Sequence, residues 1–153
     1  MEKTITLDNL DKNILNTLMH DARTPFLEIA RKNNVSGPTI HQRMAKLEAM
    51  GIIDSIKLIV KPDKMGYHLT VFIGVFLEKG SLYDHTIQIL KEIPEVTECY
   101  YTTGNYSLFL KLRCRNTEHL MEILNKRIQP IQGVERTETI ISLEQSINRQ
   151  IVP

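Results

Sequence analysis

Apolar residues in the first third of the chain recur at spacings of three and four, which is the period of a helix that buries one face. They form three groups, and each group follows a residue whose side chain can cap a helix: Asp8, Thr24 or Ser36. Pro25 and Pro38 fall in the first turns of the second and third groups, where a helix does not need the missing N–H donor. The pattern predicts three short helices around one small core, built from Leu10, Ile14, Leu15, Leu18, Phe26, Ile29, Ala30, Ile40, Met44 and Leu47.

A short turn separates the second and third predicted helices. Asn33 and Asn34 end the second helix, because asparagine tolerates the left-handed backbone conformation that a sharp helix exit requires. Val35 then returns to the core, and Ser36 starts the next helix. Two helices joined in this way form a helix-turn-helix, whose second helix can enter the major groove of DNA.

The polar flank of the third predicted helix carries side chains suited to DNA. Gln42, with His41 and Arg43 beside it, can hydrogen-bond to base edges, whereas Lys46 and Thr39 suit phosphates. An ordinary amphipathic helix with a hydrated polar face shows the same pattern, so the context of the whole chain has to separate the two interpretations. The candidate DNA-binding residues are Ser36, Gly37, Pro38, Thr39, His41, Gln42, Arg43 and Lys46.

The chain changes character after Gly51. Ile56, Leu58 and Val60 alternate with neighbours in a strand-like pattern, which indicates a wing or a linker strand. A break in this pattern between residues 61 and 67 marks a domain boundary. We therefore expect a winged helix-turn-helix domain in residues 1–53, a linker strand and hinge in residues 54–66, and a second domain in residues 67–153.

The second domain alternates between strand-like and helix-like patterns. Residues 69–77 are nearly all apolar, as in a central strand that is covered on both faces. Gly104 and Asn105 are turn residues between two antiparallel strands. The predicted order is strand, helix, strand, strand, helix, strand, in residues 69–77, 81–92, 95–103, 106–115, from Thr117 onward, and 134–145. Ser81 and Thr117 are the predicted caps of the two helices. This is an α+β fold of the ferredoxin-like βαββαβ type.

Two features favour an oligomer. Two helices cover only one face of such a sheet, so the apolar residues 69–77 predict a homodimer in which two sheets pack face to face. The chain carries a net charge of only +1, and residues 36–61 carry +2 from four cations and two acids. A single copy would gain little from counterion release, whereas paired DNA-binding domains would gain more.

Composition narrows the remaining choices. No run of about 18 apolar residues occurs, and the first twelve residues are too acidic and their apolar stretch too short for a signal peptide, so we expect a cytoplasmic protein. The predicted DNA binding would make it nucleoid-associated. Cys99 and Cys114 have no His or Cys at metal-ligand spacing, which favours buried, reduced thiols over a metal site. The sequence predicts no cofactor.

Three stretches of the sequence resemble the Lrp/AsnC family of feast/famine transcription regulators. They are LDNLDKNILNTLMHDART at the start, VSGPTIHQRMAKLEAMGII at the third predicted helix, and YYTTGNYSLFLK at the strand-turn-strand. The last segment, RIQPIQGVERTETIISLEQSINRQIVP, looks most like the asparagine-responsive branch. Many family members have an acidic residue three positions after the glycine of the turn, whereas this chain has Ser107. That departure fits the asparagine-responsive branch and argues against a response to leucine.

The resemblance implies a regulator that dimerises through its sheet and linker strand and assembles four dimers into an octamer around which DNA can wrap. It also implies that an amino-acid effector binds between dimers near the glycine turn, where backbone amides and hydroxyls suit a zwitterion. Without the family, the same turn would be interpreted as a polar hairpin. The candidate effector-binding residues are Glu98, Tyr100, Thr102, Thr103, Gly104, Asn105, Tyr106, Ser107, Thr137 and Thr139, with Glu138 as a weaker candidate.

Two other functions deserve comparison. The same architecture resembles sirohaem decarboxylases, but the five histidines are scattered over different elements and no catalytic grouping is evident. A recognition helix would have no use in such an enzyme, so we expect a protein that is not an enzyme. The other alternative is a DNA-organising protein without an effector.

Overall fold

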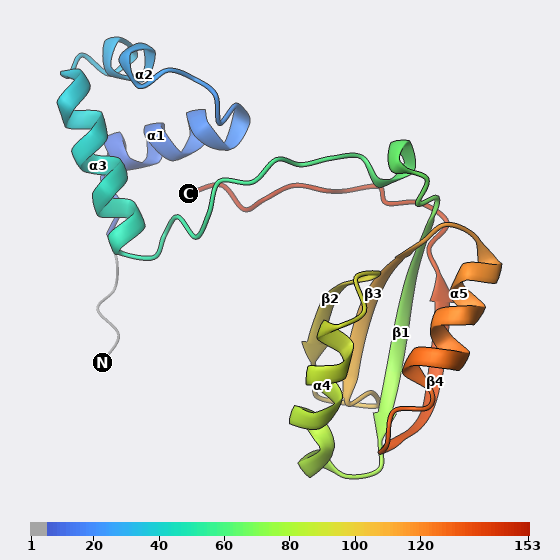
Figure 1. Cartoon of the computed structure of the whole chain (residues 1–153). Coiled ribbons are helices and arrows are strands. Elements are labelled where there is room, and N and C mark those ends of the chain that lie inside the picture. The colour runs from blue at the N-terminus through green and yellow to red at the C-terminus, as the bar shows by residue number, and fades with distance from the viewer. Residues whose placement is uncertain (1–5) are drawn as a thin grey trace. The chain divides into compact units, whose positions relative to one another are not determined.

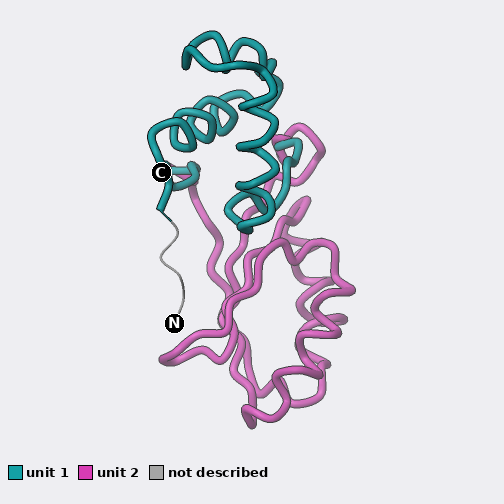
Figure 2. The backbone as a smooth tube through the Cα atoms, turned by 90° about the vertical axis from the view of Figure 1, so that its left-hand side faces the viewer, with its two compact units in different colours: residues 1–59, 147–153 teal, residues 60–146 magenta. Residues whose placement is uncertain are grey.

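The computed structural model describes residues 6–153 and divides the chain into two compact units (Figure 2). The helical unit contains the chain up to Ile59 together with Ile147–Pro153, and the sheet unit contains Val60–Ser146. One boundary between the units, after Ile59, lies within residues 54–66, where the hinge was predicted. The other lies after Ser146, so the last seven residues of the predicted second domain, residues 67–153, belong to the helical unit instead. The first five residues of the predicted N-terminal domain lie outside the described residues.

The helical unit contains the three predicted helices, shown in Figure 1 as α1 (Asn9–His20), α2 (Phe26–Lys32) and α3 (Gly37–Ala49). Their apolar faces form one core, and this core confirms the predicted positions. Its fully or nearly fully buried side chains are Ile14, Leu15, Ile29, Ala30, Ile40, Met44 and Leu47. The helical period of the apolar residues was enough to predict the buried positions, because each helix buries a single stripe of side chains.

The helix ends follow the sequence signals with one exception. The Ser36 hydroxyl accepts a hydrogen bond from the Thr39 N–H at 3.3 Å, and Asn34 has the left-handed backbone conformation, with a φ of 54°. The prediction that Thr24 caps α2 is wrong. Its hydroxyl instead donates to the Asp21 carbonyl at 2.8 Å, and the N-cap position is taken by Pro25.

The segment after α3 differs from the prediction of a linker strand. Residues 53–61 are not assigned to any strand, and no described strand of the chain pairs with them. Ile56 and Leu58 are 64% and 89% exposed. A 3-10 turn, Pro62–Met65, follows, and Gly66 ends it with a positive φ of 88°. A strand requires a hydrogen-bonded neighbouring strand, so alternating apolar residues were not enough to make this segment a strand.

The sheet unit has the predicted βαββαβ order. Its strands pair antiparallel in the order β2-β3-β1-β4, and α4 (Tyr83–Lys91) and α5 (Thr117–Ile123) lie on the same face (Figure 1). A π-helical turn, Leu124–Ile128, continues α5. The strands are β1 (Leu69–Leu77), β2 (Val96–Tyr101), β3 (Leu108–Cys114) and β4 (Val134–Ile141).

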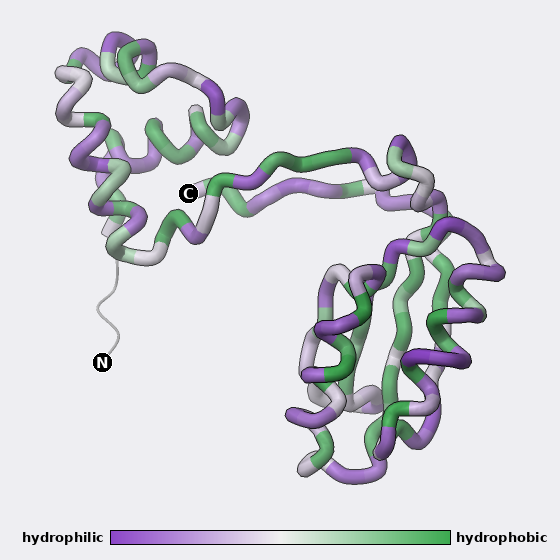
Figure 3. Tube along the Cα trace, viewed as in Figure 1, coloured by the Kyte–Doolittle hydropathy of each residue, from purple (hydrophilic) through white to green (hydrophobic). Residues whose placement is uncertain are grey.

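The core of the sheet unit lies between the two helices and the central strands, where Figure 3 shows apolar residues along β1 and β3. Every second residue of β3 is fully buried, which is the alternation expected of a strand with one covered face. The caps of these two helices differ from the prediction by one residue. A 3-10 turn, Gly80–Leu82, precedes α4, so Leu82 and not Ser81 is at its N-cap position. Thr117 is the first residue of α5, and Asn116 caps the helix by accepting the His119 N–H at 2.8 Å.

Candidate nucleic-acid interface and ligand site

The outer flank of α3 has the composition that the sequence predicted. Its inner face is fixed by Ile40, Met44 and Leu47, of which no more than 5% is exposed. The structure therefore brings most of the candidate DNA-binding residues to one surface. Ser36, Pro38, His41, Gln42 and Lys46 are exposed, and Gly37, Thr39 and Arg43 are half-buried.

Several of these side chains are already held by neighbours. The hydroxyls of Ser36 and Thr39 share a hydrogen bond of 2.8 Å at the start of α3. The His41 ring packs edge-on against Phe26, with 4.8 Å between ring centroids. Gln42 is exposed and has no hydrogen bond to another described residue, so its amide can bind a base edge without breaking an internal contact.

Arg43 lies in a different environment from the one predicted. Its Nη1 donates to Asp11 Oδ1 at 2.9 Å and also donates to the Asp8 carboxylate. These hydrogen bonds raise the pKa of the Arg43 guanidinium, and the Asp11 N–H followed by Arg43 lowers the pKa of the Asp8 carboxyl. The guanidinium is therefore committed to α1.

Asp11 is the functional candidate that the sequence analysis missed. Its side chain is 1% exposed, and its Oδ2 lies 3.6 Å from the Nζ of Lys46, the second cation of α3. The available signal was the capping box at the start of α1, in which Asp8 and Asp11 bond to each other's backbone N–H groups. The capping box by itself accounts for the presence of both carboxylates at the start of α1, and it does not indicate that they contact α3.

The turn between β2 and β3 is the core of the candidate effector site. The Thr102 hydroxyl donates to the Tyr106 carbonyl at 2.7 Å, and the Ser107 hydroxyl accepts the Leu77 N–H at 3.1 Å. Between them, Thr103, Gly104 and Asn105 form an exposed tip. Gly104 has a φ of 108°, a conformation that residues with a Cβ rarely adopt. The tip thus presents polar groups on a backbone that needs glycine.

Tyr106 joins this turn to the sheet. A Cβ on Gly74 would lie 2.3 Å from the Tyr106 ring, so glycine in the middle of β1 leaves the space that the ring occupies. The Tyr106 hydroxyl donates to Glu138 Oε2 at 2.8 Å. The ring also packs against Phe76 and Phe109, with centroid distances of 5.2 and 5.8 Å. The Tyr106 side chain therefore links the turn to the open side of β1 and β4.

We call the side of the sheet opposite α4 and α5 the open face. It carries an aromatic row in which Phe72 stacks on Phe109 at 5.7 Å, and the Arg136 guanidinium lies 3.6 Å from the centroid of the Phe76 ring. Ile140 is 49% exposed in the adjacent strand β4. Both helices of the sheet unit lie on the other face, so neither α4 nor α5 covers this apolar surface.

The remaining effector candidates are not all in one place. Glu98 and Tyr100 lie on the open face beside Lys111, whose Nζ donates to Glu98 Oε1 at 2.7 Å and lowers the pKa of that carboxyl. The strand register places Thr137 and Thr139 opposite buried residues of β1, hence on the helix-covered face. They are also in β4, at the other edge of the sheet from β2. One chain therefore does not bring these two groups together.

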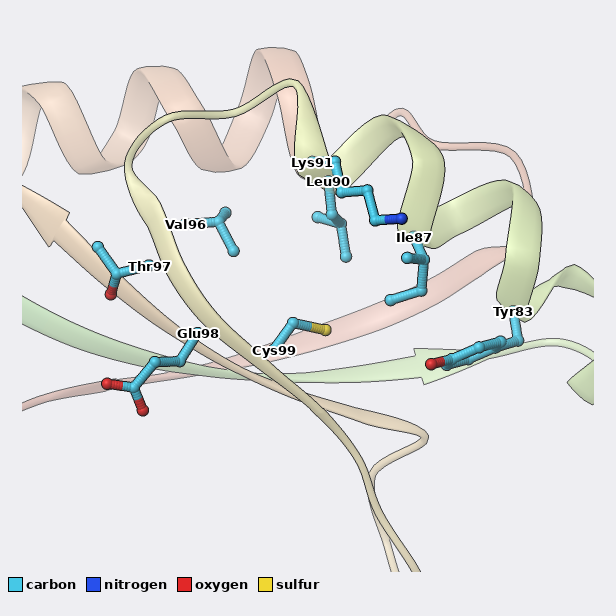
Figure 4. Close-up of a pocket in the computed structure, with 8 residues that line it drawn as sticks. All are labelled: Tyr83, Ile87, Leu90, Lys91, Val96, Thr97, Glu98 and Cys99. Carbon is cyan, nitrogen blue, oxygen red and sulfur yellow. The ribbon is translucent and has the colours of Figure 1, made fainter. Parts of the chain in front are cut away.

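A hollow of about 230 Å³ lies between α4 and the edge strand β2, on the helix-covered face (Figure 4). Its walls are mainly apolar, and the Cys99 thiol faces it whereas the Glu98 carboxylate points away. Cys99 is exposed, contrary to the prediction that both cysteines are buried, and partial desolvation raises the pKa of its thiol. The sequence did not predict this hollow.

The described residues hold neither a metal-binding cluster nor a membrane-spanning helix. Among residues 6–153, no three His, Cys, Asp or Glu side chains are grouped in a way that could hold a metal ion. None of the helices in the described part of the chain has the length and apolar character needed to cross a membrane.

Comparison with known proteins covers both units. The Lrp/AsnC ligand binding domain family matches residues 70–152, and the AsnC-type helix-turn-helix domain family matches residues 7–48. Regulatory protein AsnC of Escherichia coli (strain K12) is 42% identical over 147 residues, which cover 96% of this chain and 97% of that protein. An HTH-type transcriptional regulator of Pyrococcus horikoshii is 36% identical over 140 residues, covering 92% of this chain and 91% of that protein.

Solved structures show the same similarity. The structure of E. coli AsnC superposes with a TM-score of 0.93 at 42% identity, covering 97% of this chain and 100% of that chain. A transcriptional regulator from Neisseria meningitidis, solved as a complex with L-Met, gives a TM-score of 0.90 at 21% identity, with 97% of each chain covered. Because the N. meningitidis regulator is only 21% identical to this chain, its similarity shows a shared fold and nothing more.

Proposed function

The chain belongs to the Lrp/AsnC family of DNA-binding transcription regulators, and from this premise we propose that it regulates transcription in response to asparagine, with α3 as the helix that reads DNA. The observation that carries the DNA-reading role is the orientation of α3. Burial of Ile40, Met44 and Leu47 turns Gln42 outward and leaves its amide free for a base edge. The chain is a regulator and not an enzyme.

Asparagine as the effector is supported by the similarity to AsnC of E. coli and by Ser107. A zwitterion needs hydrogen-bond donors for its carboxylate and an acceptor for its ammonium. The exposed tip at Thr103, Gly104 and Asn105 supplies backbone and side-chain groups of both kinds. The N. meningitidis regulator with the same fold was solved with the amino acid L-Met. These features support a site at the turn, to which a neighbouring copy would contribute Thr137 and Thr139, because in one chain these lie at the other edge of the sheet from β2.

The open face supports a proposal for the assembly. An aromatic surface of this kind on a sheet is stable when another copy covers it, because a two-fold axis buries the same patch twice. The exposed apolar side chains of the linker, such as Ile56 and Leu58, need a partner for the same reason. We propose a homodimer through the open face and the linker, and an octamer of four such dimers. A transcription regulator acts on DNA, so we place it in the cytoplasm at the nucleoid.

Asparagine is expected to raise the melting temperature of the full-length protein. A ligand that binds only the folded state at 100 times its Kd contributes about 2.7 kcal/mol, which corresponds to a shift of several degrees for a chain of this size. Calorimetric melting with asparagine, leucine and alanine measures the effect. A shift with leucine and none with asparagine would assign another effector, and no shift with any amino acid would favour an effector-independent DNA-organising protein.

Replacing Gln42 with Ala should reduce specific DNA binding more than non-specific binding, because base contacts carry the sequence information. We expect about a tenfold loss of affinity for sites selected from genomic fragments, and little change for unrelated DNA at the same salt concentration. Gln88→Ala is the matched control, because Gln88 is an exposed glutamine on α4. Equal losses for both kinds of DNA would show that Gln42 does not contact bases.

A further inference from the structure

We propose that Asp11 is a positioning residue for DNA binding, which holds both cations of α3 against α1 so that Arg43 supports the helix and does not contact DNA. Asp8, Asp11, Arg43 and Lys46 are called the Asp11 cluster below. The proposal rests on the proposed role of α3 and adds a specific function for a carboxylate that faces away from DNA.

The geometry of Asp11 explains why it holds its partners firmly. A buried carboxylate is costly unless ion pairs and hydrogen bonds compensate for the lost water. Asp11 is 1% exposed, its Oδ1 accepts from Arg43 at 2.9 Å, and its Oδ2 lies 3.6 Å from Lys46 Nζ. Loss of Arg43 to DNA would leave this carboxylate poorly compensated. The resting position of Arg43 is therefore strongly preferred.

The cluster also fixes the rotation of α3. Arg43 and Lys46 are three residues apart, so they lie on the same flank of the helix, and both meet one carboxylate on α1. Each residue of a helix turns by about 100°, so a small rotation of α3 would separate both cations from Asp11. It would also turn Gln42 away from its outward direction. The cluster thus sets which side chains face the major groove.

The charges of the cluster limit indiscriminate attraction to DNA. Arg43 and Lys46 are the only lysine or arginine residues of α3, and two carboxylates, Asp8 and Asp11, face them. Paired in this way, the cations attract phosphates less than free cations do. Arg43 is 29% exposed, whereas Lys46 is 48% exposed and more loosely paired. Lys46 can turn toward a phosphate while Arg43 stays in place.

The test is Asp11→Asn, which keeps the shape of the side chain and removes its charge. With both cations released, affinity for unrelated DNA should rise severalfold, and the plot of log K against log salt concentration should become steeper by about one per released phosphate contact. The ratio of specific to non-specific affinity should fall by about tenfold, as for one lost base contact. A residue with a purely structural role would lower both affinities and leave the slope unchanged.

The matched control is Glu28→Gln, because it removes one acid from the same unit and releases Lys32 from a surface pair at 2.8 Å, away from the Asp11 cluster. We expect it to leave the affinity ratio and the slope near the wild-type values. A change as large as that of Asp11→Asn would show a general charge effect and would overturn the proposal.

The charge-balanced double variant Asp11→Asn/Arg43→Gln decides the case if circular dichroism shows that the single variant does not fold. Its salt slope should equal or exceed that of the wild type, because Arg43 makes no phosphate contact in the native protein. A salt slope that is shallower than that of the wild type by about one would overturn the proposal, because it would show that Arg43 contacts a phosphate in the native complex. A failure of the proposed function would look different, because the wild-type protein would then bind all DNA sequences with equal affinity.

Discussion

Replacing Phe109 with Asp will separate the protein into monomers and sharply reduce its affinity for specific DNA. Phe109 lies in the middle of the open face, stacked between Phe72 and Tyr106, and the dimer axis would bury two copies of the new charge. A monomer loses the second recognition helix, and the loss of two linked contacts lowers apparent affinity by about 10² to 10⁴. Sedimentation and DNA-binding titrations at matched salt concentration measure both effects.

Two companion variants make this result interpretable. Ile140→Asp places a charge on the same open face at a side chain that is already half exposed, so it preserves the aromatic stack. Met121→Asp places the same charge at an exposed position on α5, on the other side of the sheet unit. We expect Ile140→Asp to dissociate the dimer and Met121→Asp to leave it intact. A folded Ile140→Asp variant that remains dimeric would move the interface away from the open face.

Replacing Gly104 with Val will abolish the asparagine response while leaving DNA affinity without asparagine within about twofold of the wild type. The φ of 108° at Gly104 is strongly unfavourable for a β-branched residue, at a cost of about 1–3 kcal/mol, so the tip of the turn must change its shape. A Cβ there meets no atom within 4 Å, hence the change stays local. The measurement is the shift in melting temperature caused by asparagine.

The control for this variant is Gly66→Val. Gly66 also has a positive φ, 88°, and open space around its Cβ, but it follows the 3-10 turn before β1 and lies outside the candidate site. It should lower stability comparably and retain the asparagine response. If Gly104→Val kept the full response, the effector would bind elsewhere in the protein.

The sequence predicted those parts of the fold that depend on local periodicity. Each helix with a single buried stripe was found, as was the βαββαβ order, because periods of 3.6 and 2 are visible without knowledge of contacts. Asn34 and Ser36 were also interpreted correctly, since turn and cap residues act on their own backbone. The role of Thr24 was interpreted wrongly, because its hydroxyl donates to the Asp21 carbonyl three residues earlier and does not cap α2.

The features that the sequence did not predict depend on contacts between distant segments. The engagement of Arg43 by Asp8 and Asp11 spans more than 30 positions, and the capping box gave those acids a sufficient local explanation. Residues 54–60 have the alternation of a strand, but a strand forms only beside a partner. The face on which Thr137 lies depends on the pairing register of β4, which contains an irregularity at Phe76/Leu77 of β1.

The most direct test of the central claim is photocrosslinking from the outward flank of α3 to a selected DNA site. With a photoreactive side chain in place of Gln42, we predict crosslinks to bases in the major groove of both half-sites, centred about one helical turn apart. The same side chain in place of Gln88 should give none. Two results would contradict the account. One is crosslinking from the Gln88 position and none from the Gln42 position. The other is a DNA site that the protein binds without any crosslink from the Gln42 position to a base.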